Sequence, residues 1–299
     1  MARKKKIHHR HNRLSFGGKL AFVLLTILSA VILIPIVFTF LYSFFPQSEI
    51  TAYLKGRGSY DTTKWLDVLY SPAMFSLRQY YKIFIEEPSY LKLFCNSMMY
   101  TGAILVGQAL IVPLTAYCLS RFQFHGRDLL FFCILVLMIL PFQVTMAPSV
   151  TVLRWLGIME TPWAVILPMC FSPFYIFLLR QFMVGIPNEL LEAGAIDGAG
   201  NFRIFRQIVF PMAKNSTVTV VIYNFVSIWN EFTYANTFMT KDEMKTLPIG
   251  LNAFVGEMGR RDWGATFSAI VIAILPTIIV YFFLNKQVME GMAAGAVKS

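Results

Sequence analysis

Long stretches without a charged residue constrain this chain more than any other feature of its sequence. The longest lies between Lys19 and Glu49 and holds 29 residues, and several others of 16 to 28 residues follow it. A bilayer core about 30 Å thick is crossed by about 20 apolar residues of α-helix. Because lipid offers backbone N–H and C=O groups no partner, such segments satisfy them internally as helices. The pattern predicts an all-α, polytopic membrane protein.

Six membrane-spanning helices are predicted from these stretches. They cover residues 20–45, 97–119, 129–150, 163–182, 218–238 and 266–284. The first apolar run is much longer than the 7–15 residues of a signal peptide, so we expect a permanent helix. The composition agrees, because only 14% of the residues are charged, against about 25% in soluble domains.

The distribution of charge predicts the orientation in the membrane. A basic tail, residues 1–19, precedes the first span (20–45) and is expected in the cytoplasm. An extracytoplasmic segment (46–92), a transmembrane core (93–284) and a cytoplasmic tail (285–299) would follow. With this topology the whole net charge of +10 lies on the cytoplasmic side. It is therefore interpreted as a positive-inside signal, and no nucleic acid partner is expected.

The second cytoplasmic loop, residues 187–211, is rich in small residues. Pro187 suits the first turn of a helix, where its missing N–H costs no hydrogen bond. Gly198 is a natural helix stop because it is free to adopt a positive φ. Asn201 can cap a second helix, which Pro211 would end. We expect a helix–turn–helix whose small side chains let another surface approach its backbone.

Simpler interpretations of this loop compete. Gly194 and Gly198 form a GxxxG pattern, which marks helix pairing within apolar spans, but Glu192 and Asp197 place it outside the hydrocarbon. Residues 198–200 do not begin a dinucleotide fingerprint, because no strand precedes them and the third glycine is missing. An ordinary connecting loop remains an alternative on spacing alone.

The segment from Glu192 to Pro211 resembles the EAA motif of ABC importer permeases. That consensus reads Glu-Ala-Ala, three residues, Gly, nine residues, Ile, one residue, Leu-Pro, and the chain departs from it at Gly194 and Phe210. Both departures keep the small or apolar class. Residues 90–299 resemble the carbohydrate branch of the family, and most closely the smaller maltose-type permease subunit. The shared pieces are Asn96-Ser97, Trp163-Ala164 to Pro168, Leu179 to Phe182, Trp229 to Phe232, Thr246 to Pro248 and the ending Gly291 to Ser299.

The resemblance implies a type I ABC importer permease in a bacterial plasma membrane, with six transmembrane helices and a cytoplasmic coupling helix. Its expected partners are a second homologous permease, an ATPase dimer that binds ATP and Mg²⁺, and an extracytoplasmic solute-binding protein, contacted by residues 247–263. No cofactor is expected on this chain. The tail after Gly291 would also touch the ATPases and is not expected to form a helix alone. The expected ATPase-coupling residues are Glu192, Ala193, Gly194, Asp197, Gly198, Ala199, Ile208 and Pro211.

The fifth span carries a stripe of polar residues. At 100° per residue they fall within an arc of about 140° on one helix. Polar side chains within a membrane usually face a cavity or another helix, so the stripe is either a sugar pathway or a polar contact between helices. Its members are Tyr223, Asn224, Ser227, Asn230, Glu231, Tyr234 and Thr237.

Other classes of protein remain alternatives. The chain has no phosphate-binding G-x-x-x-x-G-K-[ST] loop, so we expect a transport subunit and not an enzyme. Its four cysteines lie in or beside apolar spans and predict no metal site. The rivals are an importer of another solute such as glycerol phosphate, an ion-driven secondary transporter, for which only Glu231 offers an ion ligand, and a membrane scaffold without transport.

Overall fold

The computed structural model describes residues 16–56, 72–86, 88–256 and 262–296, and all regular elements within these ranges are helical. The first half contains α1 (Phe16–Tyr42), α2 (Gln47–Gly56), α3 (Arg78–Tyr81), η1 (Lys82–Glu86), α4 (Pro88–Arg121), α5 (Arg127–Ile139) and α6 (Phe142–Trp155). The second half contains α7 (Trp163–Cys170), α8 (Pro173–Val184), α9 (Asn188–Ile196), α10 (Asn201–Ile204), η2 (Phe205–Val209), α11 (Phe210–Trp229), α12 (Thr233–Phe238), η3 (Asp242–Met244), α13 (Leu247–Gly256) and α14 (Trp263–Ala296).

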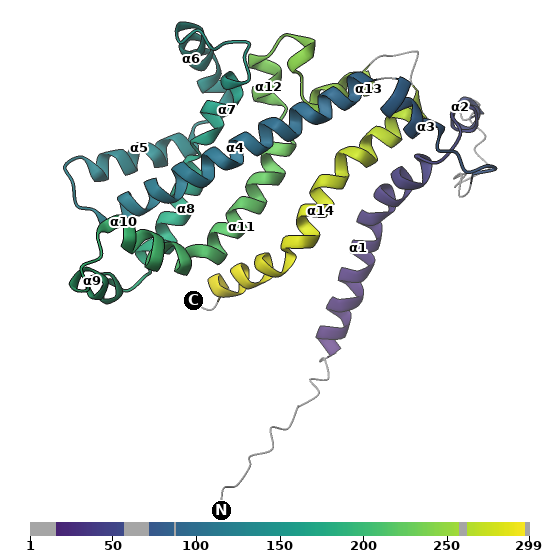
Figure 1. Cartoon of the computed structure of the whole chain (residues 1–299). Helices are drawn as coiled ribbons and strands as arrows, with labels where there is room; N and C mark the ends of the chain where they lie inside the picture. Colours follow the sequence, from purple (N-terminus) through teal and green to yellow (C-terminus); the bar gives the residue numbers. More distant parts are fainter. Residues whose placement is uncertain (1–15, 57–71, 87, 257–261, 297–299) are drawn as a thin grey trace, which may run out of the picture.

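Helix α4 is the central element of the bundle. It packs against α7, α8, α11 and α13, and Figure 1 shows it running from the region of α13 to the region of α10. Helix α14 packs against α11, and α1 lies beside α14 at the edge of the bundle. We call the end that carries α9 and α10 the α9 end, and the end that carries α2, α3 and α13 the α13 end.

Four helical stretches among the described residues are long and apolar enough to cross a membrane. They are Gly17–Tyr42, Pro88–Arg121, Trp163–Val184 and Trp263–Leu284. These correspond to four of the six predicted spans and confirm the all-α membrane architecture. The third and fifth predicted spans are not among these four, so the number of six stays a prediction.

The third predicted span, residues 129–150, is not one straight helix. The chain bends by 113° between α5 and α6. Leu140 lies between them with an extended backbone (ψ 121°), as expected for a residue before proline, because the ring of Pro141 disfavours the helical region there. The same effect separates α7 from α8, where Ser172 precedes Pro173 with ψ 105°.

The fifth predicted span, residues 218–238, also ends early. Helix α11 stops at Trp229, and the chain turns before α12. The side-chain Nδ2 of Asn230 donates to the carbonyl of Val226 on its own helix, and the Glu231 carboxylate accepts the first free N–H groups of α12. Polar side chains that bond nearby backbone groups favour such helix ends.

The C-terminal tail is largely helical. Residues 285–296 continue α14 without interruption, so a segment that would not fold alone is helical as an extension of a long helix, where propagation is easier than nucleation. Residues 297–299, and with them the last part of the predicted tail contact, lie outside the described residues. The same holds for residues 1–15 of the basic tail and for residues 57–71 of the predicted extracytoplasmic segment.

Candidate functional site: the loop of residues 187–211

Gly198 ends α9 and sets the direction of the chain that follows. Its φ is +79°, a left-handed conformation that glycine adopts at little cost. The amide of Ala199 donates to the carbonyl of Gly194 at 2.9 Å, and the amide of Gly198 to that of Ala195 at 3.0 Å. This pair of bonds is a Schellman motif. The predicted stop at Gly198 is confirmed.

Gly194 lies where α9 meets the next helical turn. A Cβ at this position would come within 2.8 Å of Cδ1 of Ile208 and 3.5 Å of Cγ1 of Ile204. Ala199 and Ile208 are half-buried against the hydrophobic cluster at this end of the bundle. Gly194, Ala199 and Ile208 therefore form the inner side of the loop, which fixes α9 to the bundle.

Other side chains of the loop are directed away from this contact. Glu192, Ala193 and Asp197 are exposed. Two large apolar side chains beside them are also exposed, Ile196 at 86% and Phe202 at 67%. Exposed apolar side chains grouped on one surface are typical of interaction sites. The loop thus presents an outer surface with acidic, apolar and small side chains, and among its small residues only Gly194 and Ala199 are half-buried against the bundle.

Two predictions about the second half of the loop were wrong. Gly200, with φ −69° and ψ 162°, occupies the cap position, and Asn201 is the first helical residue. Pro211 does not end the helix, which runs on from α10 through η2 into α11. The turn Phe205–Val209 before Pro211 is a π-helix. Its wider hydrogen-bond spacing locally replaces the regular α-helical pattern, which accommodates a residue without an N–H group.

Arg121 connects the loop to α4, and the sequence prediction missed it. Its guanidinium donates to Oδ1 of Asn188 at the start of α9, and to the carbonyls of Met183 and Ile186 at the end of α8. One turn earlier, the hydroxyl of Tyr117 donates to the carbonyl of Asn201 at 3.3 Å. The last turn of α4 thus holds both the entry and the exit of α9. A basic residue that ends a charge-free span was the only signal in the sequence.

The predicted polar stripe does not form one continuous surface. The arc of about 140° was calculated for a single helix, but α11 ends at Trp229. The positions calculated for the four stripe residues after Trp229 are therefore not valid. On α11 itself the side chain of Tyr223 is 56% exposed, whereas Asn224 is 3% exposed. Ser227 and Asn230 are exposed, and Glu231, Tyr234 and Thr237 are half-buried.

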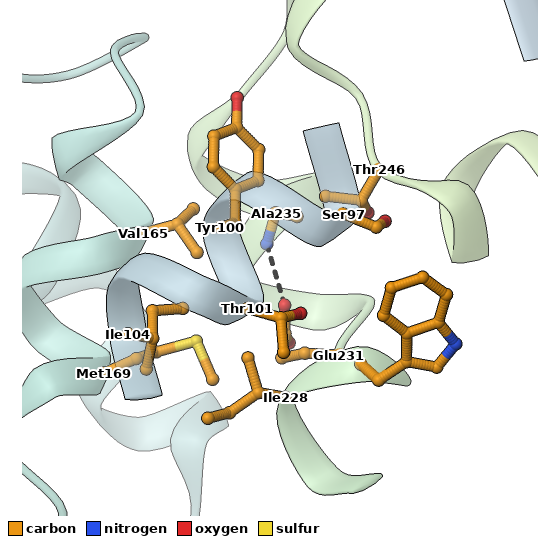
Figure 2. A pocket seen from close by; sticks show the side chains of 11 residues that line it. Ser97, Tyr100, Thr101, Ile104, Val165, Met169, Ile228, Glu231, Ala235 and Thr246 are labelled. Carbon is orange, nitrogen blue, oxygen red and sulfur yellow. Dashed lines mark hydrogen bonds between the residues drawn. The ribbon is translucent and has the colours of Figure 1, made fainter. Parts of the chain in front are cut away.

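Glu231 has a clear structural role at the break. Its Oε1 accepts the N–H of Tyr234 at 2.6 Å, and its Oε2 accepts that of Ala235 at 3.1 Å. The carboxylate therefore caps α12 and lies near its positive end. Figure 2 shows it at a small cavity, whose other polar lining comes from Ser97, Tyr100, Thr101 and Thr246. Beyond the break, the ring of Tyr234 lies 4.1 Å from that of Phe142.

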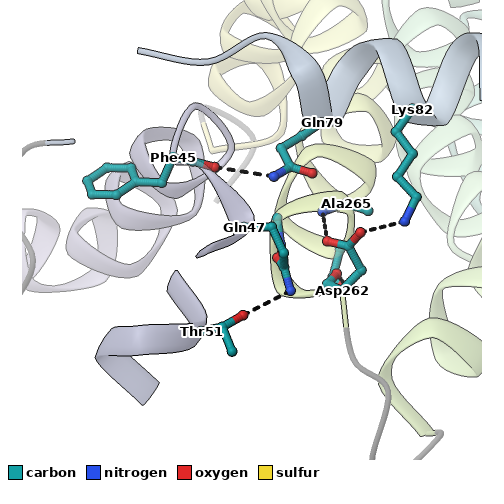
Figure 3. A network of polar contacts seen from close by, with 9 residues as sticks. Phe45, Gln47, Thr51, Gln79, Lys82, Asp262 and Ala265 are labelled. Atoms are coloured by element: carbon teal, nitrogen blue, oxygen red, sulfur yellow. Dashed lines mark hydrogen bonds and ion pairs between the residues drawn. The ribbon is translucent and has the colours of Figure 1, made fainter. Parts of the chain in front are cut away.

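A second polar cluster joins the connection between α1 and α2, together with α3 and η1, to the start of α14 at the α13 end (Figure 3). Lys82 forms an ion pair with Asp262 at 2.6 Å, and Oε1 of Gln47 accepts the N–H of Gly264 at 2.8 Å. Gln79, 3% exposed, donates to the carbonyl of Phe45. These contacts fix the end of α1 to the bundle.

The structure is a bundle of apolar helices with a helical loop at one end, which fits the class of integral membrane permeases. The chain belongs to the family described as binding-protein-dependent transport system inner membrane components, whose model matches residues 109–292. The matched region contains the loop of residues 187–211. The resemblance to ABC importer permeases is thereby confirmed.

Named relatives support the sugar branch. The arabinooligosaccharides transport system permease AraQ of Bacillus subtilis is 31% identical over 227 residues, 76% of this chain and 80% of the relative. The sn-glycerol-3-phosphate permease UgpE of Yersinia pestis is 29% identical over 198 residues, 66% of this chain and 70% of the relative. The chain is thus similar to permeases of sugar ABC transporters.

A solved structure shares the fold. A chain of a bacterial ABC transporter involved in the import of the acidic polysaccharide alginate superposes with a TM-score of 0.78 at 22% identity, covering 90% of this chain and 95% of that one. A second structure, of a bacterial alginate transporter in complex with a periplasmic protein, gives a TM-score of 0.58 at 14% identity. The likeness establishes the permease fold.

Proposed function

We propose that this chain is one permease subunit of an ATP-driven oligosaccharide importer and forms half of its translocation pathway. The observation that carries the proposal is the rigid loop of residues 187–211. Gly194, Ala199 and Ile208 face the bundle, whereas Glu192, Ala193, Ile196 and Asp197 are exposed. An ATPase subunit that bound this surface could move the loop as one body, because Arg121 and Gly194 fix it to the bundle.

The charge distribution supports a cytoplasmic position for the α9 end. Under the positive-inside rule, the basic residues of the tail and of the loops near Arg121 and Arg203 lie in the cytoplasm. Exposed Glu192 and Asp197 would then face an ATPase dimer that supplies ATP and Mg²⁺ binding. Residues 247–263, which begin with α13, would contact the extracytoplasmic solute-binding protein, and the segment from Thr240 that leads into α13 would lie on the same side of the membrane.

A second permease subunit and lipid would cover the apolar surface that the bundle leaves open. The most apolar window of α1 is 0% buried within this chain. Exposed apolar area of that extent requires lipid or a protein partner. We expect this partner to be a homologous permease, because a translocation pathway across the membrane must be enclosed by helices on all sides and this chain would supply half of them.

Transport by the reconstituted complex tests the proposal. The chain would be co-purified with its partner subunits, placed in proteoliposomes and given solute-binding protein and ATP. The expected result is vanadate-sensitive uptake of an oligosaccharide that needs the binding protein. Uptake driven by an ion gradient without ATP would instead support a secondary transporter, and no uptake under either condition would support a scaffold.

The solute is tested in the same assay. Because AraQ and UgpE are both relatives, arabino-oligosaccharides and sn-glycerol 3-phosphate are the two probes. We expect the oligosaccharide to be transported, since uncharged exposed Ser227 and Asn230 on the break offer hydrogen bonds to hydroxyl groups. If only sn-glycerol 3-phosphate were taken up, the transported solute would be a phosphorylated compound and not an oligosaccharide.

A further inference from the structure

One turn near the start of α4 holds the segment of residues 243–247. Nδ2 of Asn96 donates to the carbonyls of Glu243 at 2.9 Å and Lys245 at 3.0 Å. The hydroxyl of Tyr100 donates to the carbonyl of Met244 at 3.2 Å. Three consecutive carbonyls are thus held by two side chains of the same helix.

The start of α13 is fixed by the same turn of α4. Oγ of Ser97 accepts the N–H of Leu247 at 2.8 Å, so α13 is capped from another helix and not from its own sequence. Ser97 is 3% exposed. A Cβ on Gly250, one turn into α13, would clash with Cδ1 of Leu93. We call the contacts of Asn96, Ser97 and Tyr100 the outer clamp.

The opposite end of α4 has a corresponding set of contacts, described above. Arg121 holds the end of α8 and the start of α9, and Tyr117 holds the start of α10. Their positions differ by four, so they share one face of the helix. We call these contacts the inner clamp.

Between the two clamps α4 is continuous, with Pro113 inside the helix. The 25 residue steps from Asn96 to Arg121 span about 38 Å at 1.5 Å per residue. The paths through α5 and α6, α7 and α8, and α11 and α12 are each interrupted, at Leu140, Phe171 and Asn230. A continuous helix held at both ends passes on a displacement that a broken one absorbs at the break.

We propose that α4 mechanically links the segment 243–247 to the loop of residues 187–211. Asn96, Tyr100, Tyr117 and Arg121 act as positioning residues. The inference rests on the proposed function, in which the two clamped segments face the solute-binding protein and the ATPase. Docking of the binding protein would move the outer clamp, and α4 would carry the displacement to the inner clamp and so to α9.

The test uses the full complex in proteoliposomes and measures ATP hydrolysis with and without sugar-loaded binding protein. Asn96→Ala with Tyr100→Phe opens the outer clamp, and Tyr117→Phe with Arg121→Gln opens the inner one. Each pair is expected to lower the stimulation by the binding protein at least about fivefold, the scale of a typical coupling between sites. Hydrolysis without binding protein should stay within about twofold of the wild type.

The combination of both pairs separates a link from two independent effects. Distant independent sites are additive in free energy, so two fivefold losses would multiply. If the signal passes from one clamp through α4 to the other, opening either clamp already interrupts it. The loss of stimulation with both pairs of substitutions should then stay near the loss with one pair. Unchanged stimulation in the single pairs, or a multiplied loss in the combination, would overturn the inference.

Controls keep the outcome specific. Cys95→Ser and Ser120→Ala change α4 next to the clamps, at an exposed position and at a hydroxyl that bonds its own helix, and should leave stimulation unchanged. Tyr100→Phe and Tyr117→Phe alone retain the ring and provide variants that fold if Arg121→Gln does not. A wild-type complex without any stimulation would reject the proposed function itself, and with it the link.

Discussion

Gly194 and Ile208 lie in direct contact, because a Cβ on Gly194 would be 2.8 Å from Cδ1 of Ile208. The two residues are separated by the whole turn around Gly198, yet both belong to the segment that resembles the EAA motif. Their contact explains the spacing between these two positions of the motif. The number of residues between Gly194 and Ile208 is the number needed for α9 to fold back onto η2. The first prediction follows from this contact.

Gly194→Val is expected to impair transport while the subunit still inserts. The branched side chain would push against Ile208, and overpacking of this kind costs about 1–3 kcal/mol. Gly194→Ala should be tolerated, because the contact atom is the end of a flexible side chain and alanine favours helix by about 1 kcal/mol over glycine. Sugar uptake and thermal stability of the complex would measure both variants.

The control for that experiment is the double variant Gly194→Val with Ile208→Ala. Removing the isoleucine methyl groups opens space for the valine, so uptake should recover in part. If the double variant is no better than Gly194→Val alone, steric contact with Ile208 is not the cause.

Gly198→Asp is expected to uncouple the transporter, so that ATP is hydrolysed without sugar uptake. The position is exposed, and an added Cβ meets no atom within 4 Å, so the effect would come from the backbone and the new charge. Gly198→Asn tests the backbone alone, because asparagine tolerates the left-handed region and carries no charge. Uptake that is normal in the aspartate variant would contradict the assignment of this surface.

Gly198→Ala is expected to destabilise the loop by about 1–2 kcal/mol, the cost of a left-handed conformation in a residue with a Cβ. Gly200→Ala is the matched control, since Gly200 has φ −69° and an added Cβ there also meets nothing. Hydrogen exchange of the amides of α9 would measure the difference. Equal exchange in the two variants would show that the positive φ is not required.

Glu231→Ala is expected to lower the stability of the complex by about 0.5–2 kcal/mol, as the loss of a helix cap does. Glu231→Gln retains one acceptor oxygen and should lose less. The melting temperature of the purified complex measures both. A melting temperature unchanged by Glu231→Ala would show that the cap of α12 contributes nothing.

Asn230→Ala and Tyr234→Ala are expected to raise the apparent KM for sugar if the helix break lines the pathway. Both flank the capped turn, and neither removes a hydrogen bond to another helix that the structure shows. Tyr234→Phe separates the hydroxyl from the ring, whose contact with Phe142 it preserves. Transport kinetics equal to wild type in both alanine variants would remove the break from the pathway.

The sequence was sufficient for the class of fold and for the position of the loop. Charge-free length predicts membrane helices because each must satisfy its own backbone, and Gly198 marks a stop because a positive φ favours glycine. Family resemblance then named the class correctly from the spacing between Glu192 and Pro211.

The breaks and the clamps could not be predicted in the same way. The hydropathy of residues 129–150 fits a single straight helix as well as the bent pair α5 and α6. Only the restricted backbone of Leu140 before Pro141 distinguishes the two. Arg121 and Asn96 act through carbonyl groups of segments far away in the sequence, and backbone carbonyls leave no residue-specific pattern. The predicted positions of Tyr234 and Thr237 on the face of the fifth span were wrong, because Glu231 caps a new helix before them.

The most direct test of the account is a cross-link between α9 and the ATPase subunit. Ala193→Cys would be introduced into the complex after the four native cysteines have been replaced, with Thr151→Cys on exposed α6 as control. The ATPase subunit would carry a cysteine in its permease-facing cleft. A short bifunctional thiol reagent should link this cysteine to the cysteine at position 193 and not to the one at position 151. No product from position 193, or equal products from both, would contradict the assignment of this loop as the coupling element.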